Sequence, residues 1–390
     1  MNNKKLVITF LVIIGMVLFS YPITFILSKK GFVNIAFDNF KVVEKTDNKV
    51  LDLINRAKIG IENRVTNYFP FYYSINRFNA SINDKLDKTL YNSLNIDYYP
   101  VGVDSQNEVI LKDNDHFILI NVSKKEDLDK RLNEQINFFN EVSSICNTYI
   151  YFANRYEFYP FSKVNNINDM VGYYNKFKSS VNAKIGELKV SNKEEYLKYF
   201  FKTDHHYNMY GAYASYKDIM TLMNRPYKER NIFKIDGIAY MGSMAKSSYN
   251  TSLTDNLYDI EYSKNYNIYV DDSSDLKLYK EHKIKNTNNK FYDHFVAYFN
   301  GMYSKVLYDT GNTTKTNLLI LGDSFTWQID NLIAEEYNKT YIINIKYMNG
   351  TLDLKEFIKE NNISDILVLY ETNAVLFDHY NYNFNTKIKR

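Results

Sequence analysis

The alternation of short apolar strands with helices in the C-terminal third is the feature that most constrains the fold of this chain. Residues 318–321, 341–345 and 365–370 are apolar runs of strand length, and segments with helical spacing lie over 325–337 and from 353 to 360. Strands that alternate with helices pair in parallel, because a helix is needed to return the chain to the same end of the sheet. We therefore expect an α/β domain with a parallel sheet flanked by helices.

The segment from 109 to 153 begins with a predicted hairpin and then also alternates helix and strand. Two apolar runs separated by a polar turn predict the hairpin over 109–120. Ser123 and Glu126 have the spacing of a capping box, which opens a helix before a further strand at 148–153. The apolar face of that helix consists of Leu128, Leu132, Ile136, Phe139 and Val142.

The amino-acid composition is typical of a folded protein, and it argues against nucleic acid as a partner. The 390 residues are 45% hydrophobic and 24% charged, which is enough apolar material for a large core. The net charge of +3 comes from 48 basic and 45 acidic residues that are spread evenly, so no basic stripe is visible. The single cysteine, Cys146, excludes an internal disulfide and a cysteine-based metal site.

An uncharged apolar segment near the N-terminus predicts a membrane anchor. Residues 6–27 form a run of 22 residues between two lysine pairs, which is long enough to cross a bilayer as a helix. The end of this run has no small-x-small cleavage site, so we expect an uncleaved single-pass anchor over 1–30 and not a signal peptide. Residues 1–30 thus comprise a short cytoplasmic tip and the anchor, and the rest of the chain is expected outside the cell membrane.

The rest of the chain divides into two predicted regions. Residues 31–105 are polar and mixed, with helical patches at 49–67 and 79–93, and are expected to form a stalk or small cap. The α/β domain is expected over 106–390, with an insertion around 220–295.

A serine lies where an α/β sheet places its ligands. Ser324 follows the apolar run 317–321 in a Gly-Asp-Ser turn, at the carboxyl end of a predicted strand. The amide of Ser324 and the positive end of the helix expected after it can stabilise an oxyanion. Gly-Asp-Ser alone is a weak signal, because such turns are common after strands.

A second motif supplies an acid and a base. In an extended segment Asp204 and His206 project from the same face and His205 from the other, so a carboxylate can orient an imidazole that takes the proton of a serine. Asn208 is expected to cap a helix over 209–223. Two structurally satisfied histidines are one alternative. Zinc bound by the aspartate and the histidines is another, although no spaced second pair of ligands supports it.

These motifs resemble a known family. Residues 203–208, with Gly211 and Ala212, resemble the signature of the DHHW proteins and of the related alginate-acetylation proteins, in which tryptophan usually stands at the position of Tyr207. The resemblance spans about 105–375 and includes the segments 240–244, 299–301, 319–325, 345–347 and 366–369. Such proteins are similar to SGNH hydrolases in which the Asp-x-His element precedes the serine, and triads occur in several chain orders.

The resemblance implies an SGNH-like O-acetyltransferase of an exopolysaccharide or cell-wall glycan. An acetyl group would pass from a membrane-bound partner protein to Ser324 and then to a sugar hydroxyl of the polysaccharide acceptor. His206 would be the base and later the acid, and Asp204 would orient its ring. The resemblance calls for no cofactor and no metal.

The remaining site residues rest on weaker similarity. The oxyanion donors are expected among the amides of Ser324, Gly301 and Gly242. The substrate contacts are expected among Tyr207, Asn300 and Arg155.

Three alternatives stay open at this level. The same triad can hydrolyse a carbohydrate acetyl ester if water reaches the acyl-enzyme. A non-catalytic polysaccharide-binding or assembly protein is a different class, and it requires Ser324, His206 and Asp204 to lie apart or blocked. A membrane-anchored assistant in teichoic-acid D-alanylation is also SGNH-like, but its motifs match less well.

Overall fold

The computed structural model describes residues 72–104, 108–120, 125–162, 164, 169–263, 265–271, 276–278, 292–299, 303–378, 382 and 384–390. The predicted membrane segment, the helical patch at 49–67 and the site candidates Asn300 and Gly301 lie outside these ranges. None of the helices in the described ranges has both the length and the apolar character that a membrane span requires.

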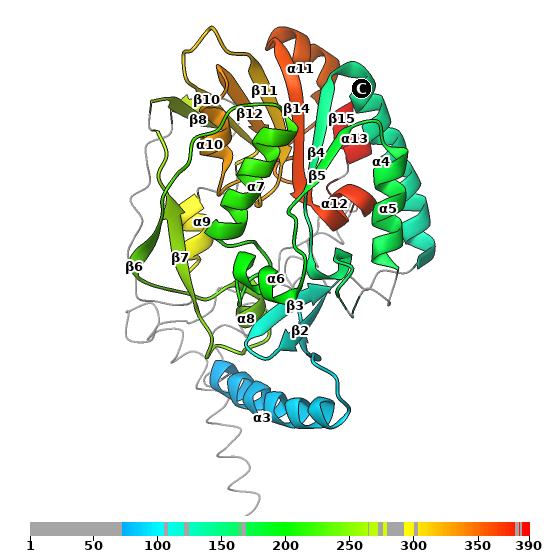
Figure 1. The fold of residues 1–390 in the computed structure, drawn as a ribbon, viewed down its shortest axis with the longest axis vertical. Helices are drawn as coiled ribbons and strands as arrows, with labels where there is room; N and C mark the ends of the chain where they lie inside the picture. Colours follow the sequence, from blue (N-terminus) through cyan, green and yellow to red (C-terminus); the bar gives the residue numbers. More distant parts are fainter. Residues whose placement is uncertain are drawn as a thin grey trace, which may run out of the picture. The chain divides into compact units, whose positions relative to one another are not determined.

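Strands and helices alternate along most of the described chain (Figure 1). The helices are α3 (Tyr72–Ser93), α4 (Lys125–Ile145), η1 (Tyr156–Phe158), α5 (Met170–Ser180), α6 (Lys193–Tyr199), α7 (Met209–Leu222), α8 (Ser243–Ser247), α9 (His294–Phe299), α10 (Asp330–Ala334), α11 (Leu354–Glu360), α12 (Thr372–Phe377) and α13 (Phe384–Lys387). The strands are β1 (Tyr99–Val103), β2 (Val109–Asp113), β3 (His116–Ile120), β4 (Asn147–Ala153), β5 (Lys184–Glu187), β6 (Ile232–Tyr240), β7 (Asp255–Ile260), β8 (Asn267–Asp271), β9 (Leu276–Leu278), β10 (Lys305–Asp309), β11 (Asn317–Gly322), β12 (Lys339–Ile343), β13 (Leu352–Asp353), β14 (Ile363–Glu371) and β15 (Ile388–Lys389).

The chain divides into two compact units. One unit comprises Met1–Ile96 with Lys246–Thr251, and its described part is mostly α3. The other comprises Asp97–Ala245 and Ser252–Arg390 and contains all the sheets. The limits of the stalk and of the insertion stay predictions.

An eight-stranded sheet organises the larger unit, in the order β5-β4-β14-β11-β12-β10-β8-β9. The strands from β5 to β12 in this order pair in parallel, whereas β10, β8 and β9 pair antiparallel with their neighbours. The expectation of a parallel sheet is therefore wrong at one side, and the sheet is mixed. The short link from β8 to β9 explains part of this difference, because a few residues can join only antiparallel strands.

Two hydrophobic cores cover the two faces of the sheet. Leu318 and Ile320 of β11 belong to one core, which includes residues of α7 and α10. Leu319 and Leu321 belong to the other, which includes residues of α4, α5 and α12. Successive residues of a strand point to opposite faces, so burial on both faces explains why β11 is an uninterrupted apolar run.

Most local predictions around this sheet are confirmed. β2 and β3 form the expected hairpin, with Val109 paired to Ile120. The predicted apolar face of α4 lies in a core, with four of its members buried and Ile136 partly buried. Asn208 caps α7, because its side chain accepts hydrogen bonds from the amides of Tyr210 and Gly211.

The helix predicted over 325–337 is confirmed only over 330–334. Residues 324–329 form turns, and the helix α10 spans only Asp330–Ala334. The amide of Thr326 donates to the carbonyl of Asp323 over 3.0 Å, an i→i+3 bond, and the Asp323 side chain accepts from the amide of Phe325 over 2.9 Å. Such local side-chain bonds compete with regular helix.

Candidate active site

Ser324 lies at the carboxyl end of β11, on a turn that is held by the preceding aspartate. Asp323 Oδ1 accepts from the amide of Phe325, and Asp323 Oδ2 accepts from the amide of Glu371 over 2.8 Å, at the end of the neighbouring strand β14. Burial raises the pKa of Asp323 to about 6. The carboxyl group thus joins two strand ends and fixes the backbone on both sides of the serine.

His206 connects this turn to the Asp-His segment. Its Nε2 lies 2.7 Å from Ser324 Oγ, and its Nδ1 lies 2.6 Å from Asp204 Oδ1. A carboxylate only accepts hydrogen bonds, so Nδ1 carries the proton and Nε2 is left to accept the proton of the serine hydroxyl. Asp204, His206 and Ser324 therefore form one line of hydrogen bonds, although Ser324 lies more than a hundred residues from the other two.

Asp204 is held as an anion by its surroundings. Its Oδ2 accepts from the hydroxyl of Tyr240 over 2.9 Å and from the amide of Ser243 over 2.7 Å. Burial on its own acts to raise the pKa of Asp204, but the neighbouring His205 and His206 and the hydrogen bonds outweigh it, and the pKa lies well below its ordinary value. The carboxylate can therefore stabilise an imidazolium across the pH range in which enzymes work.

Gly242 permits the close approach of this segment to Asp204. A Cβ at Gly242 would lie 2.4 Å from Asp204 Cβ and 2.4 Å from the carbonyl oxygen of Thr203, so only glycine fits. Its amide donates to Thr203 Oγ1 over 2.9 Å. The prediction that Gly242 supplies an oxyanion donor is not supported, because this amide is already engaged.

The amide of Ser324 is the oxyanion donor that the geometry leaves available. Among the described residues it has no hydrogen-bond acceptor, whereas the amides of Phe325 and Thr326 are engaged by Asp323. The expected contribution from a helix terminus is absent at this position, because α10 begins at Asp330. A free N–H beside the nucleophile is the kind of donor that an oxyanion requires.

His205 lies beside His206 and not on the opposite side as predicted. Residues 202–206 form bends, so the alternation of an extended strand does not apply to them. The two imidazole centroids are 4.0 Å apart, His205 Nδ1 lies 3.3 Å from Ser243 Oγ, and 28% of the His205 side chain is exposed. Burial and the neighbouring His206 lower the pKa of His205 to about 3, which keeps this ring neutral.

Asp204, His205 and His206 were also candidates for a metal site. Ligand atoms of Asp204, His205 and His206 lie within 4.8 Å of one another, and the described chain contains no other such group of three. Both oxygens of Asp204 and both ring nitrogens of His206 already have hydrogen-bond partners, however. The arrangement fits a proton-transfer chain better than a zinc site.

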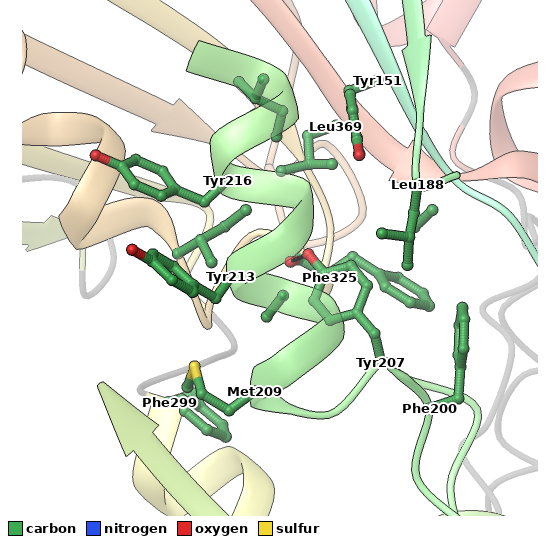
Figure 2. Packing of buried hydrophobic residues seen from close by; sticks show 14 of the residues in the cluster. Tyr151, Leu188, Phe200, Tyr207, Met209, Tyr213, Tyr216, Phe299, Phe325 and Leu369 are labelled. Carbon is green, nitrogen blue, oxygen red and sulfur yellow. Dashed lines mark hydrogen bonds between the residues drawn. The ribbon is translucent and has the colours of Figure 1, made fainter. Parts of the chain in front are cut away.

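Tyr207 is a core residue, which contradicts its predicted contact with substrate. Its side chain is 0% exposed, and its hydroxyl donates to the carbonyl oxygen of Phe325. The rings of Tyr207 and Phe325, both labelled in Figure 2, meet edge to face. Their centroids are 5.0 Å apart. Tyr207 therefore ties the Asp-His segment to the turn that carries the serine.

Replacing Tyr207 with phenylalanine is expected to destabilise the protein by about 1–2 kcal/mol, because a buried carbonyl loses its donor. We also expect slower acylation by an aryl acetate, since the serine turn is less firmly held. Urea unfolding and the acylation rate measure the two effects. Tyr210→Phe, at a side chain that is 41% exposed, is the matched control. Equal stability of the two variants would contradict the proposed link.

Arg155 is buried, so the structure does not place it where a substrate would contact it. Its side chain lies among three carboxylates, with Nη1 2.7 Å from Glu108 and 3.2 Å from Glu371, and Nε 3.7 Å from Glu157. Only 2% of the residue is exposed. Arg155 is thus the centre of a buried ion cluster near the end of β14.

Sequence reasoning did not identify three residues of the site. Tyr240 and Asp323 lie within segments that carry the family resemblance, so their places in the motifs were the available signal. Phe295 of α9 stacks on the His206 ring, with centroids 4.3 Å apart and an interplanar angle of 21°. It stands in no motif, and no sequence signal pointed to it.

Comparisons with known proteins bear on the fold of this chain. No protein-family model and no curated protein matches the sequence, but solved structures do. A DHHW family protein from Eubacterium siraeum has a TM-score of 0.53 and 18% identity, with 74% of this chain and 98% of that chain covered. The chain shares the fold of a DHHW family protein. The predicted DHHW-type resemblance is therefore confirmed at the level of the fold.

Two further solved structures are among the matches. Bacillus cereus PatB1 with a sulfonyl adduct has a TM-score of 0.54 and 18% identity, over 70% of this chain and 98% of that chain. The O-acetyltransferase domain of Pseudomonas putida AlgJ has a TM-score of 0.39 and 9% identity, over 67% of this chain and 90% of that chain.

Proposed function

We propose that this protein is a serine-dependent O-acyltransferase that moves an acetyl group through Ser324 onto hydroxyls of an exopolysaccharide or cell-wall glycan. The observation that carries the proposal is the unbroken hydrogen-bond line from Ser324 through His206 to Asp204, with both distances below 3 Å. A base in contact with a hydroxyl, itself oriented by a third group, is the arrangement that activates a serine. The choice of acetyl and of glycan rests on the DHHW resemblance.

The first half-reaction forms the acyl-enzyme. Ser324 Oγ attacks the carbonyl carbon of the donor while its proton passes to His206 Nε2, and the negative oxygen of the tetrahedral intermediate accepts from the Ser324 amide. Asp204 stabilises the imidazolium that results. The intermediate collapses as the bond to the leaving group breaks, and His206 returns the proton to that group.

The second half-reaction transfers the acyl group. A sugar hydroxyl loses its proton to His206 Nε2 and attacks the acyl carbon, and Ser324 leaves with that proton. The acylated sugar is then released, and Ser324 and His206 are back in their starting protonation states. Water in place of the sugar gives hydrolysis, so an acetyl esterase is the alternative that shares every residue.

The N-terminal apolar segment supports an acceptor outside the cell. We propose that residues 6–27 anchor the chain once in the cell membrane, with the larger unit outside, where exopolysaccharide and cell-wall glycan lie. Activated acyl donors are made in the cytoplasm. We therefore also propose a membrane-bound partner protein that transfers the acyl group across the membrane. The measurement for the anchor is extraction of the full chain from membranes, by detergent but not by salt.

Replacing Ser324 with alanine is expected to abolish acyl transfer. The full chain in detergent is incubated with an aryl acetate and candidate oligosaccharides, and release of the phenol, acetylated sugar and protein mass are followed. Wild type is expected to gain one acetyl group at Ser324 and to pass it on. A sulfonyl fluoride should block Ser324, as a sulfonyl adduct has been seen in PatB1. Ser191→Ala, at an exposed serine, is the matched control.

The outcomes separate the candidate functions. Acetylated sugar that depends on Ser324 supports the transferase, and acetate release without sugar product supports the esterase. If Ser324→Ala and wild type behave alike in every assay, a binding or assembly role replaces both.

A further inference from the structure

The one tryptophan of the chain lies beside the candidate active site and has no part in the hydrogen-bond line. Trp327 follows Ser324 by three residues, within the same run of turns. Its side chain is only partly buried, unlike the aromatic rings of Phe325 and Phe295. Among the described residues its indole N–H has no hydrogen-bond partner.

Ring contacts place Trp327 close to the reacting atoms. Its ring centroid lies 6.0 Å from that of Phe295, at an interplanar angle of 36°. Phe295 in turn stacks on His206, whose Nε2 contacts Ser324. Trp327 is therefore one aromatic ring away from the imidazole.

A partly exposed indole in this position has the properties of a sugar-binding surface. The apolar C–H faces of a pyranose pack against the electron-rich face of an aromatic ring, and the indole N–H can donate to a sugar oxygen. His205, the other partly exposed ring next to His206, is a neutral imidazole that can bond a hydroxyl. A few polar groups with an aromatic wall are typical of ligand sites.

We propose that Trp327 forms an acceptor subsite, on which it stacks a pyranose ring of the polysaccharide next to the unit whose hydroxyl meets Ser324. The idea that the bound polysaccharide receives the acyl group rests on the proposed function. Binding of sugar at Trp327 is a separate property, and it can be measured without turnover.

The chain offers a direct optical probe of this subsite. Because Trp327 is the only tryptophan, indole emission excited at the red edge of the absorption band comes from this ring alone. The full chain in detergent, as the Ser324→Ala variant, is titrated with polysaccharide extracted from the envelope of cells that carry the protein. We expect a blue shift of the emission and protection of Trp327 from quenching by acrylamide.

The outcomes are independent of whether acyl transfer occurs. Unchanged emission together with unchanged quenching at saturating polysaccharide would overturn the subsite, even if Ser324 proved essential for transfer. A spectral response with no acyl transfer in wild type would support the subsite and remove the enzymatic proposal instead.

Kinetics of two variants separate binding from structural support. In Trp327→Ala we expect the KM for polysaccharide to rise about tenfold, the value for loss of one good aromatic contact, with acylation by a small aryl acetate unchanged. Trp327→Phe keeps a ring and is expected to recover most of the affinity. An equal loss of aryl acetate acylation in both variants would show that Trp327 only supports the turn, and would refute the proposal.

Discussion

Replacing Asp204 with asparagine is expected to lower the rate of acyl-enzyme formation by about three to four orders of magnitude. The carboxylate accepts the Nδ1 proton of His206 over 2.6 Å and remains ionised. An amide at this position loses the negative charge that stabilises the imidazolium, and its NH₂ group can turn the ring into the wrong tautomer. Single-turnover acylation by an aryl acetate measures the effect.

A neighbouring aspartate provides a matched control for this prediction. Asp255 accepts from the amide and hydroxyl of Thr203 and from the amide of Lys202, and it does not contact His206. Asp255→Asn is expected to lower stability but to leave acylation within about tenfold of wild type, because it supports the backbone only. If both variants lost acylation equally, Asp204 would be a structural residue and not the partner of the base.

The residues of the hydrogen-bond line could be found in the sequence for a physical reason. Ser324 follows an apolar run that has to be a buried strand, and strand ends are where α/β sheets bind ligands. Asp204 and His206 contact each other within a local bend, so their close spacing in the sequence was informative even though the extended geometry assumed for them does not occur. Local geometry of this kind is readable from a short motif.

Other features depend on long-range packing and were not readable. Phe295 reaches His206 from a separate helix, and Arg155 meets carboxylates contributed by β14 and by the segments next to β2 and β4. Tyr207 was expected at a substrate from its place in the motif of the family resemblance. Its full burial arises only when the serine turn packs over it. The mixed strand directions of the sheet likewise depend on which strands from the middle of the chain join it, and this is decided by long-range packing.

Replacing Arg155 with alanine is expected to destabilise the protein by about 3–5 kcal/mol, because it leaves buried carboxyl groups without their cation. Unfolding of the full chain in detergent, followed in urea by tryptophan emission, measures the loss. Lys130→Ala is the contrasting control, since its ion pair with Glu134 spans 3.9 Å between largely exposed side chains and contributes little. Equal effects in the two variants would mean that the buried cluster adds no stability.

The pH dependence of this loss gives a second test of the cluster. Burial raises the pKa of Glu371 to about 8, while Arg155 acts in the opposite direction. A carboxyl group whose pKa is higher folded than unfolded holds its proton in the folded state, so its contribution to stability falls as pH rises from about 4.5 toward 8. Without Arg155 the charged form becomes costlier and the pKa of Glu371 in the folded state rises further, so the deficit of the variant should grow as pH rises above about 8, where the wild-type protein ionises this group. A deficit that stayed constant as pH rises through and above about 8 would show that lost packing of the arginine side chain, and not its charge, accounts for the effect.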